Sequence, residues 1–134
     1  MSIDPKSMRQ RFAALTTAHA GLRVGVPARC APAGLGPVVP GGRTVGRVRP
    51  ARHAGSVDIF LEAIDRAAPG DVLVVDNAGR TDEACVGDLV VLEAQAAGLA
   101  GVVIWGLHRD TVDIRAVGLP VFSVSVQLSD PVSE

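Results

Sequence analysis

Residues 56–76, SVDIFLEAIDRAAPGDVLVVD, contain the pattern that decides the fold. In the first half, apolar residues recur at helical spacing, and Ser56 or Asp58 can cap the helix. Pro69-Gly70 ends that helix, and the apolar run at 71–76 is typical of a buried strand. The stretch therefore predicts a helix followed by a strand, the repeating unit of an α/β fold. The helical face that we expect to be buried consists of Ile59, Phe60, Ala63, Ile64 and Ala67.

The alternation of helix and strand continues toward the C-terminus. A loop at 77–80 leads to a second helix, and residues 102–105 are typical of a second buried strand. A polar loop is expected through 108–110, and residues 119–126 are strand-like. The stripe of the second helix that we expect to face the core consists of Leu89, Leu92, Ala96 and Leu99.

The N-terminal third has a different character. Residues 43–53 alternate between apolar and polar or basic side chains, which predicts a half-exposed strand, and Pro50 places its later part at an edge or a bend. The preceding stretch, 25–42, is rich in Gly and Pro and is expected to be irregular. We expect one domain over 1–134, with an irregular part at 1–42 and a core at 43–126.

Composition adds a charge asymmetry. Apolar residues make up 48% of the chain and aromatic residues only 3%, so the core must consist of Val, Leu, Ile and Ala. Residues 1–54 hold nine basic side chains and one acid, whereas residues 55–134 hold four basic side chains and thirteen acids. The basic part could bind nucleic acid through phosphates. Because no aromatic residues interleave it, we favour packing against the acidic remainder, within an oligomer, and expect no nucleic-acid partner.

Several classes of protein are disfavoured by particular residues. The single lysine, Lys6, lies in a polar segment, which argues against Schiff-base chemistry. Cys30 and Cys85 lack metal-site spacing, so a reduced, cytoplasmic protein is expected. The N-terminus has no signal-peptide pattern, and no apolar run reaches the length of a membrane span, so no membrane association is expected.

Two polar segments follow expected strands or precede expected helices, where ligands gather in α/β domains. Residues 87–90, Gly-Asp-Leu-Val, offer backbone amides for an anion at the start of a helix. Arg109 and Asp110 offer a carboxylate or enolate binder beside a ligand for a hard metal ion. Both segments have a simpler interpretation that the spacing leaves open. Gly87-Asp88 can be a helix cap, and Arg109-Asp110 a solvated ion pair.

The remaining chemically distinctive side chains have no shared spacing. His19, His53 and His108 are therefore expected to be structural or solvent-exposed rather than ligands. Trp105 at a strand end is expected to belong to the core or to an interface. Cys85 is expected to behave as a small buried apolar residue.

Four stretches of this sequence resemble the RraA-like family. They are residues 67–76, 87–89, 100–110 and 119–122, within a similarity that extends over 43–122. The most specific element is an Asp, twenty residues, Arg-Asp, two residues and an acid, which here are Asp88, Arg109, Asp110 and Asp113. The family contains metal-dependent 4-hydroxy-4-methyl-2-oxoglutarate aldolases with oxaloacetate decarboxylase activity, and a protein regulator of ribonuclease E.

The resemblance implies a role for each motif residue. The substrate carboxylate would rest on the backbone amides of Gly87, Asp88, Leu89 and Val90. Arg109 would bind the 2-oxo acid and stabilise its enolate, and Asp110 would bind Mg²⁺ or Mn²⁺. Asp88 would orient a water or shuttle a proton. The implied fold is a layered β/β/α swivelling domain, assembled as a homotrimer with sites between subunits.

The sequence departs from the family pattern in several respects. We expect part of the usual N-terminal helix to be missing near 16–23, and also the strands that usually follow the Leu-Pro-Val-Phe motif. His108 stands where a residue such as Val is usual, and Trp105 where a small or polar residue is usual. Our leading hypothesis is a metal-dependent carbon–carbon lyase that releases pyruvate from a 2-oxo acid. The alternatives are a non-catalytic protein-binding regulator and an inactive shortened homologue.

Overall fold

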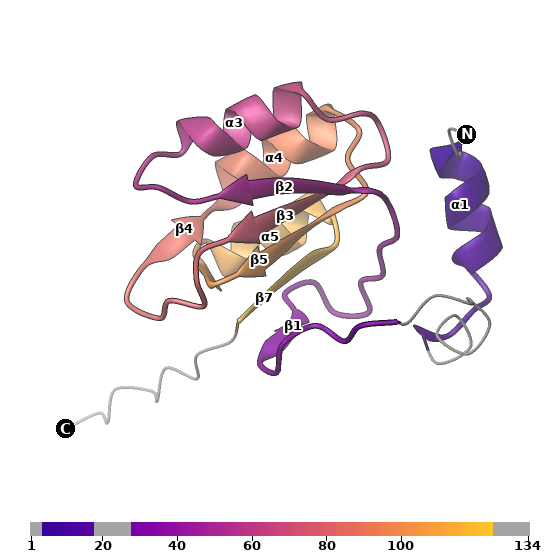
Figure 1. Ribbon diagram of the computed structural model, residues 1–134, viewed down its shortest axis with the longest axis horizontal. Helices are drawn as coiled ribbons and strands as arrows, with labels where there is room; N and C mark the ends of the chain where they lie inside the picture. The colour runs from indigo at the N-terminus through magenta and orange to yellow at the C-terminus, as the bar shows by residue number, and fades with distance from the viewer. Residues whose placement is uncertain (1–3, 18–27, 125–134) are drawn as a thin grey trace.

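A computed structural model describes residues 4–17 and 28–124, and its centre is a five-stranded sheet (Figure 1). The strand order is β1-β7-β5-β3-β2, with β1 antiparallel to β7 and the other neighbours parallel. The expected α/β class is therefore confirmed. The strands are β1 (Leu35–Pro37), β2 (Val48–Arg52), β3 (Val72–Asp76), β5 (Gly101–Trp105) and β7 (Val121–Val124).

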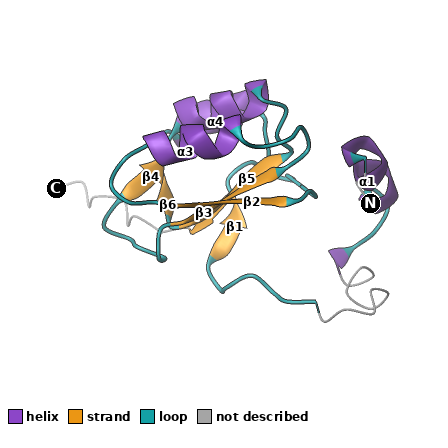
Figure 2. Cartoon of the chain, turned by 45° about the horizontal axis from the view of Figure 1, so that its top comes forward, coloured by secondary structure: helices purple, strands orange, loops and turns teal. Residues whose placement is uncertain are grey.

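Three helices connect the parallel strands: α3 (Asp58–Asp65), α4 (Asp88–Ala96) and α5 (Thr111–Val117). Each connection moves one position in the same direction across the sheet, so right-handed crossovers place all three helices on one face. Helix α3 packs against α4 (Figure 2), and α4 also packs against α5. The helices expected near 59–67 and 89–99 are present, whereas α5 was not expected, because Thr111–Val117 followed a stretch assigned to a polar loop.

The strands alternate between the helix-covered face and the opposite face of the sheet. On the covered face, side chains of successive strands form fully buried rows, and fully buried residues of the helices lie over them. Each such apolar side chain contributes about 1.5–3 kcal/mol by leaving water. As the composition predicts, Phe60 is the one aromatic residue in the described core. The buried set that joins the layers is Phe60, Leu73, Val75, Val91, Val102, Ile104 and Ile114.

The face of α4 that meets the core differs from the expectation. The structure buries Val90, Val91 and Ala94, whereas Leu89 is 72% exposed and Leu92 is 43% exposed. Leu99 is buried, but it lies beyond the end of the helix. The physical reason is that α4 carries apolar side chains on nearly every side, so periodicity alone does not select one face.

A second, two-stranded parallel sheet forms from β4 (Ala84–Val86) and β6 (Leu107–His108), which the sequence interpretation assigned to loops. Strand β6 comes directly after β5, and Gly106 makes the bend between them. A Cβ atom at Gly106 would lie 2.8 Å from Cβ of Asn77, so only glycine lets the chain turn so close to the end of β3.

The first residue of the N-terminal helix, Pro5, lies against Gly70, close to the start of β3. Helix α1 (Pro5–Phe12) is capped by Asp4, whose carboxylate accepts from the Ser7 amide at 2.9 Å. The Arg43 guanidinium donates to the Ala13 carbonyl at 3.0 Å, just beyond this helix. Strand β2 is an edge strand, as Pro50 predicted, although it is shorter than the expected 43–53. None of the helices in the described ranges is long and apolar enough to cross a bilayer.

Candidate functional site

The two motifs singled out in the sequence are brought together by the small β4–β6 sheet. Gly87 follows the last residue of β4, and Arg109 follows the last residue of β6. The two strands run parallel, so their carboxyl ends meet at the same edge. The pairing continues one residue further, because the Arg109 amide donates to the Val86 carbonyl at 2.9 Å.

Gly87 is packed closely against the Arg109-Asp110 turn. A Cβ atom at position 87 would lie 2.6 Å from Oδ2 of Asp110 and 3.0 Å from Nε of Arg109. The backbone at Gly87 has φ −119°, which any residue can adopt, so lack of space is the reason for glycine. Three of the predicted site residues therefore lie in direct proximity.

The turn itself contains an unusual backbone conformation. Asp110 has φ 61° and ψ 43°, in the left-handed region, at the N-cap of α5. Such a conformation costs about 1–3 kcal/mol in a non-glycine residue and is maintained by its surroundings. The side chains of Arg109 and Asp110 are 60% and 39% exposed, and Arg109 Nε lies 3.5 Å from Asp110 Oδ2. The pair is thus open to a ligand from solvent.

The residues that follow Gly87 form the first turn of α4. The Asp88 carboxylate accepts from the Leu89 amide at 2.9 Å, the local pattern of a helix start. The Leu89 side chain points to solvent and that of Val90 into the core, so only their backbone amides could face an anion. Asp113 lies on the exposed surface in the first turn of α5.

His108 is more tightly connected than its sequence pattern indicated. Its Nδ1 lies 2.6 Å from Oγ of Ser123, and its Nε2 lies 2.8 Å from Oγ1 of Thr111. Burial, and to a lesser degree the charge of Arg115, lowers the pKa of His108. Sequence analysis missed Ser123 and Thr111, and the available signal was a lone hydroxyl residue within the apolar run of β7.

A second polar group lies at the carboxyl ends of β2 and β3. His53 Nδ1 is 3.1 Å from Oδ1 of Asn77 and 3.5 Å from Oε1 of Glu83, and its ring stacks on Phe60. His53 is therefore structural, one of the two roles expected for it, whereas His19 lies outside the described residues. Nearby, a hydrogen bond from Arg80 lowers the pKa of the exposed Asp82.

Trp105 ends β5 beside this group. Its carbonyl accepts from the amides of Asn77 at 3.0 Å and Gly79 at 3.1 Å. Gly79 also lies against the indole ring, where a Cβ atom would approach Cζ2 to 2.8 Å. The half-buried ring therefore forms part of the surface between β5 and the loop after β3.

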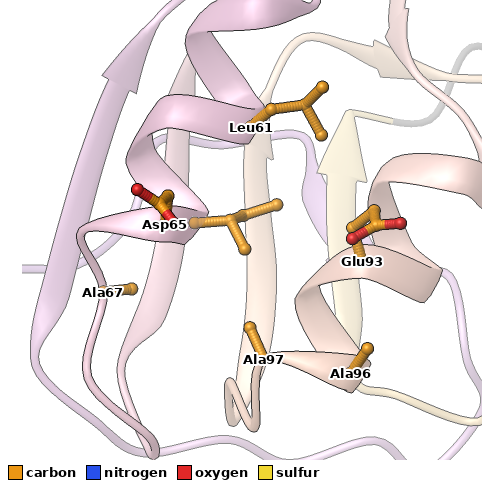
Figure 3. Close-up of a pocket in the computed structure, with 7 residues that line it drawn as sticks. Leu61, Asp65, Ala67, Glu93, Ala96 and Ala97 are labelled. Atoms are coloured by element: carbon orange, nitrogen blue, oxygen red, sulfur yellow. The ribbon is translucent and has the colours of Figure 1, made fainter.

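An open hollow of about 700 Å³ lies away from these motifs, between α3 and α4 (Figure 3). Its apolar lining includes Leu61 and Ile64 from α3 and Ala96 from α4, and Asp65 and Glu93 supply its charged groups. Because both charges are negative, the hollow is unsuited to a carboxylate ligand.

The comparison with known families decides the identity of the fold. A family model described as "RraA-like: Aldolase/RraA" matches residues 16–134. The chain belongs to the RraA-like family. A "Putative 4-hydroxy-4-methyl-2-oxoglutarate aldolase" from Halalkalibacterium halodurans is 36% identical over 81 residues, covering 60% of this chain and 39% of that protein. The chain spans about half or less of the length of the first curated relatives that it matches.

Solved RraA-like structures agree with the fold. An uncharacterised protein from Pseudomonas syringae superimposes with a TM-score of 0.74 at 29% identity, covering 92% of this chain and 57% of that chain. A Streptomyces coelicolor protein, described as an unusual member of the RNase ES inhibitor RraA protein family, gives a TM-score of 0.60 at 30% identity, covering 69% and 48%. The family thus includes relatives with an aldolase name and relatives with a regulator name.

The residues present fit the divalent ion that the family resemblance implies. In the described part of the chain, no group of three His, Cys, Asp or Glu side chains could enclose a metal. Mg²⁺ does not need such a cage, because it usually keeps several waters and takes one or two carboxylates. The Asp110 carboxylate is 39% exposed, so it can supply such a ligand from the protein side.

Proposed function

We propose that this RraA-like protein is a divalent-metal-dependent lyase that cleaves 4-hydroxy-4-methyl-2-oxoglutarate, or a related 4-hydroxy-2-oxo acid, to pyruvate. The observation that supports this most directly is the close approach of Gly87 to Arg109 and Asp110. This contact brings together the start of α4, whose backbone amides can bind an anion, the Arg109 guanidinium, and the Asp110 carboxylate, a group of the type that binds hard metal ions. The aldolase name of the curated relatives agrees with it.

The reaction transfers one proton and one electron pair within the substrate. The C4 hydroxyl loses its proton, the C3–C4 bond breaks, and its electrons form the enolate of pyruvate. Protonation of that enolate at C3 completes the reaction, and the other fragment leaves as a second 2-oxo acid. Oxaloacetate decarboxylation passes through the same enolate after loss of CO₂, so one site can perform both reactions.

Each motif residue has a role in this proposal. Arg109 binds the 2-oxo acid and places a fixed positive charge beside the oxygen that becomes the enolate. The backbone amides at 87–90 hold the other carboxylate, and Asp88 orients the water that takes and returns the proton. Asp110 would hold the divalent ion, which would act as a Lewis acid when bound. The single lysine, Lys6, is exposed on α1, so imine chemistry has no candidate residue in this chain.

The test is pyruvate release from 4-hydroxy-4-methyl-2-oxoglutarate with Mg²⁺, with Mn²⁺ and with EDTA. We expect metal-dependent release that Asp110→Ala removes and that Asp65→Ala leaves unchanged, because Asp65 is an exposed carboxylate on the distant hollow. No release from folded protein with either metal would contradict the lyase. That result would favour a non-catalytic protein-binding role, as the regulator name of the Streptomyces relative suggests.

A further inference from the structure

We propose that His108 is a positioning residue that holds the Arg109-Asp110 turn in its ligand-binding geometry by linking it to β7. The identity of the ligand that the turn binds depends on the proposed function. The link between the turn and β7 is argued independently, from the hydrogen bonds of the His108 ring. His108 does not touch the substrate in this proposal, and it acts through the two residues that follow it.

The side-chain bonds of His108 span the turn. Nε2 of His108 lies 2.8 Å from Oγ1 of Thr111, so the residues on either side of Arg109 and Asp110 are joined directly. On its other side, Nδ1 lies 2.6 Å from Oγ of Ser123, which is 1% exposed within β7. The imidazole therefore ties a surface turn to the interior of the main sheet.

The turn needs such a link because of its own conformation. Asp110 adopts a left-handed backbone that an L-residue rarely keeps without support. Two backbone hydrogen bonds hold the chain before and after the turn. The Arg109 amide donates to the Val86 carbonyl at 2.9 Å, and the Ile114 amide donates to the Asp110 carbonyl at 2.9 Å. These two bonds do not cross it, and the side chains of Arg109 and Asp110, which contact Gly87, remain 60% and 39% exposed. The bond from His108 to Thr111 does cross it.

The imidazole is chemically suited to this bridge. A neutral ring has one nitrogen that donates and one that accepts, and a hydroxyl can do either. Both bonds can therefore form at once without a buried charge. An aliphatic side chain of similar size would fill the space but would leave the buried Ser123 hydroxyl and the Thr111 hydroxyl without this partner.

Hydroxyl variants of Thr111 test the bridge with little change in volume. We expect Thr111→Val to weaken Mn²⁺ binding by about 10-fold or more, as loss of a ligand-supporting hydrogen bond commonly does, and Thr111→Ser to retain binding. His108→Gln, which can reach Thr111, should retain more affinity than His108→Leu. Isothermal titration with Mn²⁺ gives the affinities, thermal melting checks the fold, and pyruvate release gives KM and kcat separately.

Hydrogen exchange separates this inference from the proposed function. In Thr111→Val, exchange at the Arg109 and Ile114 amides should accelerate relative to wild type and Thr111→Ser, with or without metal. If the wild type binds no Mn²⁺ through Asp110, the proposed function fails while exchange still decides whether the bridge holds the turn. Wild-type exchange rates in both Thr111→Val and His108→Leu would overturn the inference.

Discussion

At the scale of single residues, the candidate site depends on the absence of a Cβ atom at Gly87. Gly87 leaves the space in which the Asp110 carboxylate and the Arg109 guanidinium lie, and its dihedral angles would suit any residue. The constraint therefore comes from neighbours that are distant in sequence. A pattern such as Gly-Asp at a helix start could not distinguish this packing role from ordinary capping.

Gly87→Ala is therefore expected to displace Asp110 and Arg109 rather than to strain its own backbone. Inserting a methyl group into such a packed position costs about 1–3 kcal/mol of unfolding free energy. We expect pyruvate release to fall at least about 10-fold, because a small displacement of positioned groups has large catalytic effects. Gly36→Ala is the matched control, since nothing lies within 4 Å of its added Cβ. Equal activity of both variants would contradict the packing role.

The two cysteines are expected to differ sharply in reactivity. Cys30 is exposed and Cys85 is buried, where burial raises the pKa of its thiol to about 11. Since the thiolate is the reactive form, iodoacetamide at pH 8 should label Cys30 and spare Cys85 in the folded protein. Mass spectrometry reads the sites, and unfolding in guanidinium should expose both. Labelling of Cys85 before unfolding would argue against its place in the core.

The raised pKa of the Cys85 thiol predicts that the folded protein loses stability at alkaline pH. The unfolded chain releases the Cys85 proton near the ordinary thiol pKa of 9.0, whereas the folded chain keeps it until about pH 11. The folded state thus binds more protons in this window, so stability falls as pH rises from 9 to 11, by about 2 kcal/mol. Urea denaturation across that range measures the slope, which Cys85→Ala should reduce.

At the scale of elements, the small β4–β6 sheet places both motifs. It consists of three residues paired with two, and its strands are separated by the whole of α4 and β5. The main sheet determines the layers, whereas the proposed site lies at the end of this smaller pair. Loops between the elements of α/β folds often carry functional residues on a rigid scaffold. Here the connections after β3 and β5 form strands β4 and β6, which pair with each other.

Helix α4 offers a test at this scale, because its buried face differs from the one that the leucines suggested. Val91→Ala should lower the free energy of unfolding by about 2 kcal/mol, since Val91 is fully buried. Leu92→Ala should change it by about 0.5 kcal/mol or less. Urea denaturation of dilute protein measures both. A larger loss for Leu92→Ala would restore the leucine stripe as the core face.

The sequence supports some elements better than others for physical reasons. The helix with Phe60 and Ile64, and the strand at 72–76, combine clear periodicity with Pro-Gly punctuation, and both were predicted. Strands β4 and β6 are too short to show a pattern, and their pairing is non-local. Helix α5 contains four β-branched residues and was not expected from the sequence. The motif at Arg109-Asp110 was singled out because its residues are adjacent. The link from His108 to Ser123 joins residues on either side of a helix, so only the hydroxyl residue within the apolar run of β7 pointed to it.

At the scale of the whole molecule, the basic and acidic parts of the chain meet within one subunit. Arg49 pairs with Asp71 at 3.3 Å and Arg52 with Asp76 at 3.2 Å, so arginines of β2 pair with an aspartate just before β3 and with the last residue of β3. The exposed Arg52–Asp76 pair contributes little stability, typically below about 1 kcal/mol, whereas the Asp71 carboxylate of the other pair is buried. Both pairs show that part of the N-terminal positive charge has a partner inside the chain.

The assembly is a prediction at this scale. We propose a homotrimer in which a second copy covers apolar side chains beside the motifs, since Leu89 is 72% exposed and Val112 76% exposed. Light scattering coupled to size exclusion should give about three times the chain mass of 13.8 kDa. Val112→Glu should reduce the mass of the assembly while the subunit keeps its fold. A wild-type monomer at all concentrations would contradict the trimer.

The position of Trp105 has a practical consequence for following this protein in solution. The chain has one Trp and no Tyr, so ultraviolet emission arises from a single place, the end of β5. That indole lies against Gly79 and only a few residues before His108 and the Arg109-Asp110 turn. The molecule therefore has a single intrinsic fluorophore four residues before its candidate site in sequence, and titrations that test metal or 2-oxo acid binding can use its emission without an attached dye.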